Sequence, residues 1–254
     1  MKILGSDYDG TLTQGGFDEA KFSAIQKWRE AGNLFGVVSG RGVNFREMLL
    51  ENIPQLQFDF LVVCNGGYIT DGAGRLICET RCTDLPLATI AKDLFAWGCK
   101  FIHFNGEGYM CLVESAEDIP YFVPKEQGCL MEEMPPVKYF NQISVQLSSV
   151  EEAALLTSKI AEKYKQWLTP HQNGICIDIV PVGVTKTQGM YRVMEFFGCE
   201  YKDVITVGDN FNDADMLREF RSYAMENGVE EIRCLANETV GSVTELLEKE
   251  LRML

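Results

Sequence analysis

The sequence predicts an α/β protein, with a doubly wound, mostly parallel, Rossmann-like core sheet and an inserted α+β cap domain. Three observations support this fold class. Short apolar runs near both ends of the chain do not alternate with polar residues, which is typical of strands buried on both faces. Segments with helical periodicity separate these runs, as in a βαβ arrangement. The middle of the chain instead has hairpin and antiparallel patterns, which indicate a separate module.

The core elements follow in order along the chain. The predicted strands are "KILGSD" (2–7), "NLFGVVSG" (33–40), "FDFLVVCNGG" (58–67), "DVITVGD" (203–209) and "SYAM" (222–225). The predicted helices are "DEAKFSAIQKWREAG" (18–32), "RGVNFREMLLEN" (41–52), "TKTQGMYRVMEFFGCE" (185–200) and "NDADMLREF" (212–220). In the first helix, Phe22, Ile25 and Trp28 are three residues apart and lie on one face.

The middle of the chain contains a different set of elements. Two apolar runs in "CKFIHFNGEGYMCLVES" (99–115) flank Asn105-Gly106, which predicts a hairpin turn at that dipeptide. A strand in 138–149, a helix over 150–164 and a strand in 174–182 follow. We therefore predict a core of residues 1–81 and 183–254, with residues 82–182 inserted as a separate module.

Composition excludes several classes of protein. The 254-residue chain carries a formal charge of −14, which argues against a nucleic-acid or anionic-membrane surface. The nine cysteines form no CxxC pair, so they predict free thiols in a reducing compartment. The start "MKILGSDYDG" lacks the apolar run of a signal peptide, and a cytoplasmic location is expected. The sequence makes no prediction of oligomeric state.

Polar residues cluster at the predicted carboxyl ends of the core strands, where open α/β sheets bind ligands. They are Asp7 and Asp9, Ser39 and Gly40, Asn65 and Gly66, and Asp209 with Asn212 and Asp213; Lys186 opens a nearby helix. Taken singly, each has a simpler interpretation: a turn or capping residue, or a solvated lysine. Together, four carboxylates would meet a single lysine. A hard divalent cation would balance this excess negative charge, and carboxylate and water ligands suit Mg²⁺.

The motifs "DYDGTL", "SGR", the lysine of "GVTK" and "GDNFND" occur in this order. In this pattern the chain resembles the haloacid dehalogenase-like (HAD) phosphohydrolases, and the insert after "NGG" resembles the Cof-type subgroup with a type IIB cap. Two positions depart from the family pattern. Glu226 stands where relatives have glycine, and Thr187-Gln188 follow Lys186 where many have a small residue sooner.

The resemblance implies a mechanism and a set of roles. Asp7 would be the nucleophile that forms an aspartyl-phosphate, and Asp9 the general acid and base. Mg²⁺ would be held by Asp7, the main-chain carbonyl of Asp9 and Asp209, with Asp213 close by. Lys186 would neutralise charge at the nucleophile. Phosphate contacts are expected from the group Ser39, Gly40, Asn65, Gly66 and Asn212.

Alternatives remain at this point. The chain lacks a GxxxxGK[ST] loop and a GxGxxG after a strand, which argues against a P-loop NTPase and a dinucleotide site. His103 and His171 pair with no nucleophile by spacing. The predicted activity is hydrolysis of a small phosphorylated metabolite; a phosphotransferase acting on a sugar and a non-catalytic phosphate-sensing module stay open. The cap sequence does not identify the metabolite.

Overall fold

The computed structural model describes residues 1–121 and 123–253, which form two compact units. The first unit comprises Met1–Cys78 and Thr185–Leu254, and the second comprises Glu79–Val184. The second unit begins at Glu79 where the sequence suggested 82, and it ends at Val184 where the sequence suggested 182.

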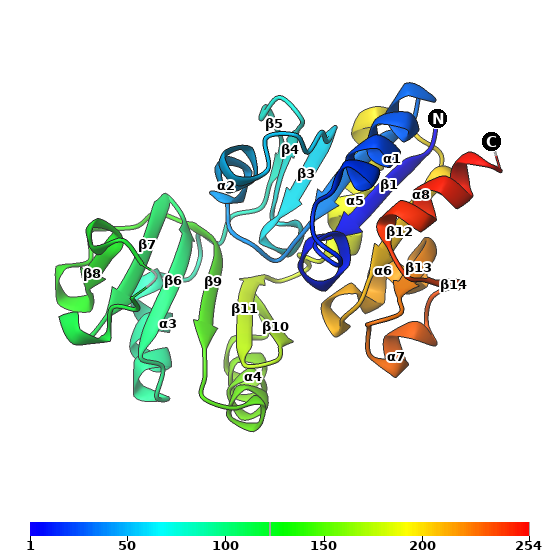
Figure 1. Cartoon of the computed structure of the whole chain (residues 1–254). Coiled ribbons are helices and arrows are strands. Elements are labelled where there is room, and N and C mark those ends of the chain that lie inside the picture. The colour runs from blue at the N-terminus through cyan, green and yellow to red at the C-terminus, as the bar shows by residue number, and fades with distance from the viewer. Residues whose placement is uncertain (122, 254) are drawn as a thin grey trace. The chain divides into compact units, whose positions relative to one another are not determined.

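An eight-stranded sheet forms the centre of the first unit (Figure 1). Its strands are β1 (Ile3–Asp7), β2 (Leu34–Val38), β3 (Phe60–Val63), β4 (Tyr68–Asp71), β5 (Leu76–Glu79), β12 (Val204–Gly208), β13 (Arg221–Met225) and β14 (Glu238–Val240). The spatial order is β14-β13-β12-β1-β2-β3-β4-β5. The strands from β14 to β3 are parallel, and β4 runs antiparallel to β3. The predicted, mostly parallel α/β core is therefore confirmed.

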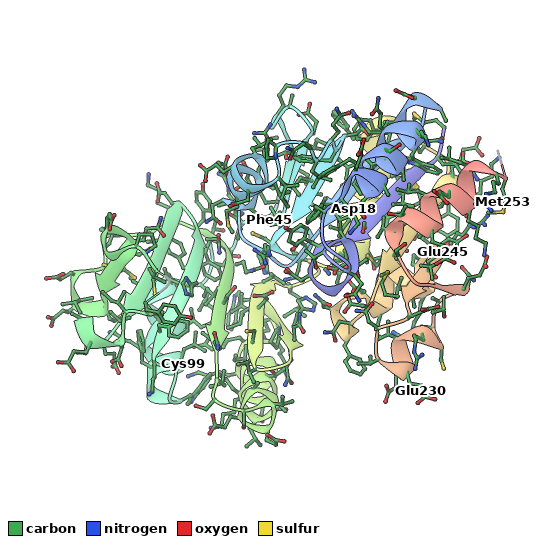
Figure 2. All side chains as sticks on the ribbon, viewed as in Figure 1. Asp18, Phe45, Cys99, Glu230, Glu245 and Met253 are labelled. Carbon is green, nitrogen blue, oxygen red and sulfur yellow. The ribbon has the colours of Figure 1, made fainter. Side chains whose placement is uncertain are left out.

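Helices cover both faces of this sheet. They are α1 (Glu19–Glu30), α2 (Phe45–Asn52), α5 (Lys186–Phe197), α6 (Ala214–Glu219), α7 (Glu230–Arg233) and α8 (Val243–Leu251). Leu61 and Val63 of β3 pack in a cluster with α1, α2 and α8, and Phe45 of α2, labelled in Figure 2, belongs to it. Phe60 and Val62 point the other way, into a cluster with α5 and α6. Continuous apolar strands are thus buried on both sides, as their sequence indicates.

Side-chain caps explain where two of the core helices begin. The Asp18 carboxylate accepts from the Lys21 backbone N–H at the start of α1 (2.9 Å). The Thr185 hydroxyl accepts from the Gln188 backbone N–H at the start of α5 (3.1 Å). The helix suggested for 41–52 begins only at Phe45. Ser39 therefore does not cap this helix, but its hydroxyl accepts from the backbone N–H of Arg41, as in a turn.

The second unit is a six-stranded sheet with two helices on one face. Its strands are β6 (Phe101–Gly106), β7 (Gly108–Val113), β8 (Gly128–Leu130), β9 (Phe140–Gln146), β10 (Leu168–Asn173) and β11 (Cys176–Pro181), in the order β10-β11-β9-β6-β7-β8. The helices are α3 (Leu87–Ala96) and α4 (Val150–Tyr164), and both pack in one cluster with apolar residues of β6, β9 and β11. This is an α+β module, as predicted.

The hairpin in this unit differs from its sequence prediction in one detail. Asn105 and Gly106 end β6, and Gly106 pairs with Gly108 of β7. The turn therefore centres on Glu107, and Asn105 is a buried strand residue. Gly108, with φ of 104°, supplies the left-handed conformation that lets the chain reverse there.

No helix in the described part of the chain is long and apolar enough to cross a membrane.

Candidate active site

The chain turns sharply where β1 ends, and this turn positions the first carboxylates. Residues Tyr8–Leu12 follow Asp7 in a tight π-type turn in which Gly10 has φ of 81°. A Cβ atom at Gly10 would lie 2.4 Å from Oδ2 of Asp209. Glycine is therefore required twice over, by its backbone conformation and by the close approach of Asp209 from the loop after β12.

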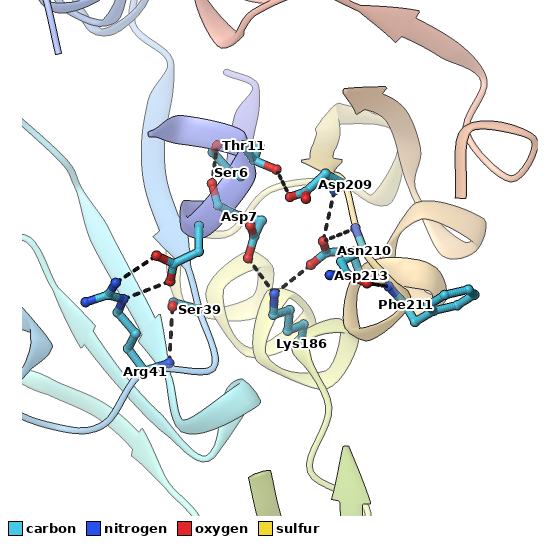
Figure 3. Close-up of polar contacts among 12 residues, drawn as sticks. Ser6, Asp7, Thr11, Ser39, Arg41, Lys186, Asp209, Asn210, Phe211 and Asp213 are labelled. Atoms are coloured by element: carbon cyan, nitrogen blue, oxygen red, sulfur yellow. Dashed lines mark hydrogen bonds and ion pairs between the residues drawn. The ribbon is translucent and has the colours of Figure 1, made fainter. Parts of the chain in front are cut away.

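Lys186 joins two carboxylates from separate strands of the sheet (Figure 3). Its Nζ lies 2.6 Å from Oδ1 of Asp7 and 2.6 Å from Oδ1 of Asp213. All three side chains are buried, and Asp213 and Lys186 have at most 1% of their side chains exposed. The other oxygen of Asp213 accepts from the backbone N–H groups of Asp209 (3.1 Å) and Asn210 (3.2 Å). Asp213 is thus fully engaged by protein groups.

Asp209 completes the acidic cluster. Its Oδ1 accepts a hydrogen bond of 2.6 Å from the hydroxyl of Thr11, which ties the β12 loop to the β1 loop. One carboxylate oxygen from each of Asp7, Asp209 and Asp213 lies within 4.8 Å of the others. Carboxylates from two strand ends therefore converge on one point, as the parallel sheet predicts.

The charges in this cluster are unbalanced. Burial raises the pKa of Asp7 well above its usual value, and the charge of Asp213 raises it further, against the opposing effect of Lys186. Burial also raises the pKa of Asp209. Burial alone would lower the pKa of Lys186, but Asp213 and Asp7 outweigh it and raise that pKa. One ammonium thus faces more negative charge than it can neutralise.

Asp9 lies in the same turn but contacts a different cation. Both of its carboxylate oxygens accept from the guanidinium of Arg41, from Nε at 2.8 Å and from Nη2 at 2.7 Å. This contact raises the pKa of Arg41. The backbone N–H of Arg41 donates to the hydroxyl of Ser39 (3.1 Å), which is buried at the end of β2. Asp9 and Ser39 are therefore connected through one residue.

The remaining predicted residues lie in the flanking loops. Asn65 is buried, has φ of 52°, and its backbone N–H donates to the carbonyl of Ser39 (3.1 Å). Gly66 packs against the start of α5, where a Cβ atom would lie 2.2 Å from the carbonyl oxygen of Thr185. Gly40 and Asn212 are half-buried neighbours of Ser39 and Asp213 along the chain.

The sequence motifs predicted no role for three residues that contact this site in the structure. They are Thr11, which binds Asp209, Arg41, which binds Asp9, and Asn227, whose side-chain amide donates to the carbonyl of Gly10 (2.9 Å). Thr11 and Arg41 stand inside the motifs "DYDGTL" and "SGR", so their position in the sequence was the available signal. Asn227 lies in the loop after β13, and only the fold brings it to Gly10.

The donor set fits a hard divalent cation. Asp7 and Asp209 present carboxylate oxygens beside the backbone of the β1 turn, and no thiol or imidazole belongs to the cluster found among the described residues. Oxygen-only donors suit Mg²⁺ over Zn²⁺ or copper. The raised pKa values of Asp7 and Asp209 indicate a place where added positive charge would be stabilising.

Comparison with known proteins identifies the class. The family model of the haloacid dehalogenase-like hydrolases matches residues 4–246, and the chain belongs to this family. The resemblance inferred from the motifs is therefore confirmed, and the protein is a hydrolase of the HAD superfamily.

Two curated relatives are distant but match nearly the whole chain. A 5-amino-6-(5-phospho-D-ribitylamino)uracil phosphatase of Bacillus subtilis, YwtE, is 24% identical over 92% of this chain and 90% of its own length. A phosphatase of the same description from Escherichia coli, YbjI, is 23% identical over 99% of this chain and 97% of its own. The HAD subclass IIB sugar phosphatase BT4131 has the same fold, with a TM-score of 0.79, 16% identity and complete coverage of both chains.

Proposed function

We propose that this protein is a magnesium-dependent phosphatase that hydrolyses a phosphate monoester of a small metabolite through a phosphorylated Asp7. The observation that carries the proposal is the buried bridge from Lys186 to Asp7 and Asp213 beside Asp209. Asp7 lies at a strand end, is held by an ammonium, and belongs to an acidic cluster that one ammonium does not neutralise. Such a carboxylate is suited to attack phosphorus when a metal ion is bound beside it.

Lys186 keeps Asp7 in place for this attack. It holds one oxygen of Asp7 at 2.6 Å, which leaves the other oxygen to form the bond to phosphorus. As that bond forms, the bond from phosphorus to the leaving oxygen breaks. Ser39 donates to a phosphoryl oxygen, and the ammonium of Lys186 offsets the charge that gathers there.

Mg²⁺, when bound, supplies the positive charge that holds the phosphoryl oxygens and lowers their repulsion toward the nucleophile. Asp7, Asp209 and the main-chain carbonyl of Asp9 would hold it. Asp213 would act on the metal only indirectly, because its two oxygens already accept three hydrogen bonds, one from Lys186 and two from backbone N–H groups.

Asp9 handles the proton. It gives a proton to the leaving oxygen in the first half of the reaction and takes one from water in the second, when that water attacks the phosphorus and releases Asp7. Two carboxylates one residue apart thus perform different steps. Asp7 makes the covalent bond, and Asp9 makes none.

The relatives suggest where to search for the substrate. Two of them are named for a phosphoribityl compound, and a structural neighbour is described as a sugar phosphatase. We therefore propose a substrate whose phosphate is esterified to a polyhydroxylated carbon chain. Screening should begin with phosphorylated sugars, sugar alcohols and ribityl compounds.

Phosphate release from an aryl phosphate tests the reaction. We expect release that needs Mg²⁺, stops on chelation and returns when Mg²⁺ is restored in excess. Full activity after exhaustive chelation would refute the metal requirement. Release with water as the sole acceptor distinguishes a hydrolase from a phosphotransferase, and absence of any turnover would favour a sensing module.

Rapid-quench labelling tests the separate roles of the two carboxylates. Asp7→Asn should form no acid-stable phosphoryl-enzyme, because the nucleophile is gone. Asp9→Asn should still become labelled by a substrate with a good leaving group and then release phosphate slowly, because no base activates water. Equal labelling of the two variants would contradict the assignment.

A further inference from the structure

The contact between Arg41 and Asp9 has no part in the mechanism above. We propose that Arg41 is a positioning residue, which orients the Asp9 carboxylate for proton transfer through a two-pronged contact. The proposal rests on the proposed function, since it concerns the residue to which the proton is assigned.

The geometry of the contact fixes orientation as well as charge. The guanidinium reaches both oxygens of Asp9, from Nε at 2.8 Å and from Nη2 at 2.7 Å. A planar fork of this kind matches the plane of a carboxylate, whereas an ammonium makes a point contact. The carboxylate plane of Asp9 is therefore set by Arg41.

Arg41 itself is held on several sides. Its guanidinium carbon lies 5.1 Å from the centre of the Tyr8 ring and 5.0 Å from that of Phe45. The two rings contact each other edge to face, with their centres 4.7 Å apart. The carbonyl of Arg41 accepts from the backbone N–H of Cys64 (2.8 Å). A side chain packed against aromatic rings, on an anchored backbone, can set the orientation of the carboxylate that it binds.

The exposure of the pair suits a contact that loosens during turnover. The side chains of Arg41 and Asp9 are 39% and 53% exposed. Because both side chains are partly exposed, water can replace one of the two hydrogen bonds when that bond opens. Asp9 needs one free oxygen to exchange a proton with the substrate, and the second bond to Arg41 keeps the carboxylate aligned while the first is open.

The same residue also connects Asp9 to the expected phosphate contact. The backbone N–H of Arg41 donates to the hydroxyl of Ser39 (3.1 Å). In Figure 3, Arg41 lies on one side of Asp7, and Asp209 lies on the other. The segment 39–41 therefore sets the position of the hydroxyl that meets the phosphoryl group and of the carboxylate that serves the leaving oxygen.

A leaving-group comparison tests the proposal. The kcat/KM of Arg41→Ala and Arg41→Lys is measured with phenyl phosphate, whose leaving oxygen needs a proton, and with 4-nitrophenyl phosphate, which needs little help. Because general acid catalysis contributes roughly 10²–10⁴-fold, we expect losses of about 10–100-fold for phenyl phosphate and less than about threefold for 4-nitrophenyl phosphate. Arg41→Lys should resemble Arg41→Ala, because a point charge does not set the carboxylate plane.

Two further variants separate positioning from a general structural effect. Arg75→Ala removes another arginine that is paired with an aspartate, Asp71 at the end of β4. This variant should leave kcat/KM unchanged for both substrates. In the Asp9→Asn background, adding Arg41→Ala should cause no further loss in the rate of phosphoryl-enzyme formation, since Arg41 acts through Asp9.

The results of these experiments distinguish a failure of the role of Arg41 from a failure of the proposed function. Wild-type phosphate release together with a substrate-dependent loss in the Arg41 variants supports the role of Arg41. Three results would overturn the role of Arg41 and leave the proposed function standing. They are equal losses of kcat/KM for both substrates, full activity of Arg41→Lys, and a further loss in the rate of phosphoryl-enzyme formation when Arg41→Ala is added to Asp9→Asn. Absence of magnesium-dependent release by the wild-type protein overturns the proposed function, and the role of Arg41 with it.

Discussion

Asp7 and Asp9 stand one residue apart, yet each contacts its own cation. At about 5 Å and an effective dielectric constant of about 20, two such charges would repel by roughly 3 kcal/mol. The structure relieves this by pairing Asp7 with Lys186 in the interior and Asp9 with Arg41 at the surface. In the proposed mechanism, this pairing separates the buried carboxylate that forms the bond to phosphorus from the accessible one that transfers the proton.

The buried carboxylate should make metal-free stability depend on pH. The pKa of Asp7 is raised on folding, so the native state binds its proton more tightly than the unfolded state does. The contribution of Asp7 to stability is then fully present below its unfolded pKa of about 3.9 and is lost as pH rises through its folded pKa. Asp7→Asn has no such group and should lose none of this contribution.

Urea unfolding in the presence of a chelator measures this effect. We expect Asp7→Asn to be at least as stable as the wild-type protein at pH 8, with its relative stability falling toward pH 5. Carboxylates that do not interact with Asp7 cancel in this comparison, because both proteins contain them in the same surroundings. A wild-type protein that gains stability over Asp7→Asn as pH rises would show that Lys186 more than offsets the burial of Asp7.

At the residue scale, sequence predicted the chemical groups better than their contacts. Asp7, Asp209, Asp213 and Lys186 follow predicted strands or open a predicted helix, and the parallel sheet brings them into contact. The pairing of Asp9 with Arg41 depends on side-chain directions in two loops, which neither periodicity nor motif spacing specifies.

At the scale of elements, the loop after β3 holds α5 in position. Cys64 and Asn65 both have positive φ, which is uncommon outside glycine and costs about 1–2 kcal/mol per residue. This strained loop lets Gly66, with φ of 107°, meet the carbonyl of Thr185 at the first turn of α5. Lys186 is the residue after Thr185, so the loop packs against the turn that carries the ammonium, and we expect it to help position that group.

Gly66→Ala should therefore damage both stability and activity. A Cβ atom there meets a backbone carbonyl at 2.2 Å, so α5 must move. Backbone strain and overpacking together should cost about 3 kcal/mol. The displaced Lys186 should lower kcat at least about tenfold, since small misplacements of catalytic groups are costly.

Gly198→Ala is the matched control for this variant. Gly198 ends the same helix with φ of 68°, and a Cβ atom there meets nothing within 4 Å. It should cost only about 1 kcal/mol of left-handed strain and leave kcat unchanged. Chemical denaturation and steady-state kinetics compare the two variants, and equal kcat values would disprove the link from Gly66 to Lys186.

The sequence predicted those elements that carry strong local signals. The helix over 150–164 coincides with α4, because its amphipathic pattern is long and Ser149 caps it. The strand β10, which contains Pro170, was not predicted, since proline argues against a strand. Pro170 is tolerated because β10 is an edge strand of its sheet. The antiparallel β4 was also not predicted, because its four residues carry no alternation.

At the scale of the whole molecule, the chain leaves the core sheet after β5 and returns at Thr185, which caps α5. The inserted unit has its own core, with α3 and α4 packed on its sheet. The carboxylates, Lys186 and Ser39 all belong to the first unit. We therefore expect the first unit to perform the chemistry and the inserted unit to act as a cap that selects the substrate.

Deletion of the insert tests this division. Residues 82–182 are replaced by a short Gly/Ser linker, and magnesium-dependent phosphate release is compared with that of the full chain for a generic aryl phosphate and a panel of phosphorylated metabolites. The truncated core should retain slow turnover of the aryl phosphate, because Asp7, Asp9, Asp209 and Lys186 remain. Its preference among metabolites should disappear, because the inserted unit, which we expect to select the substrate, would be gone. Asp7→Asn in the truncated core controls for background hydrolysis. A folded core that keeps the metabolite ranking of the full chain would show that selectivity lies in the first unit, in which case the loops that follow β1, β2 and β12 must recognise the leaving group themselves.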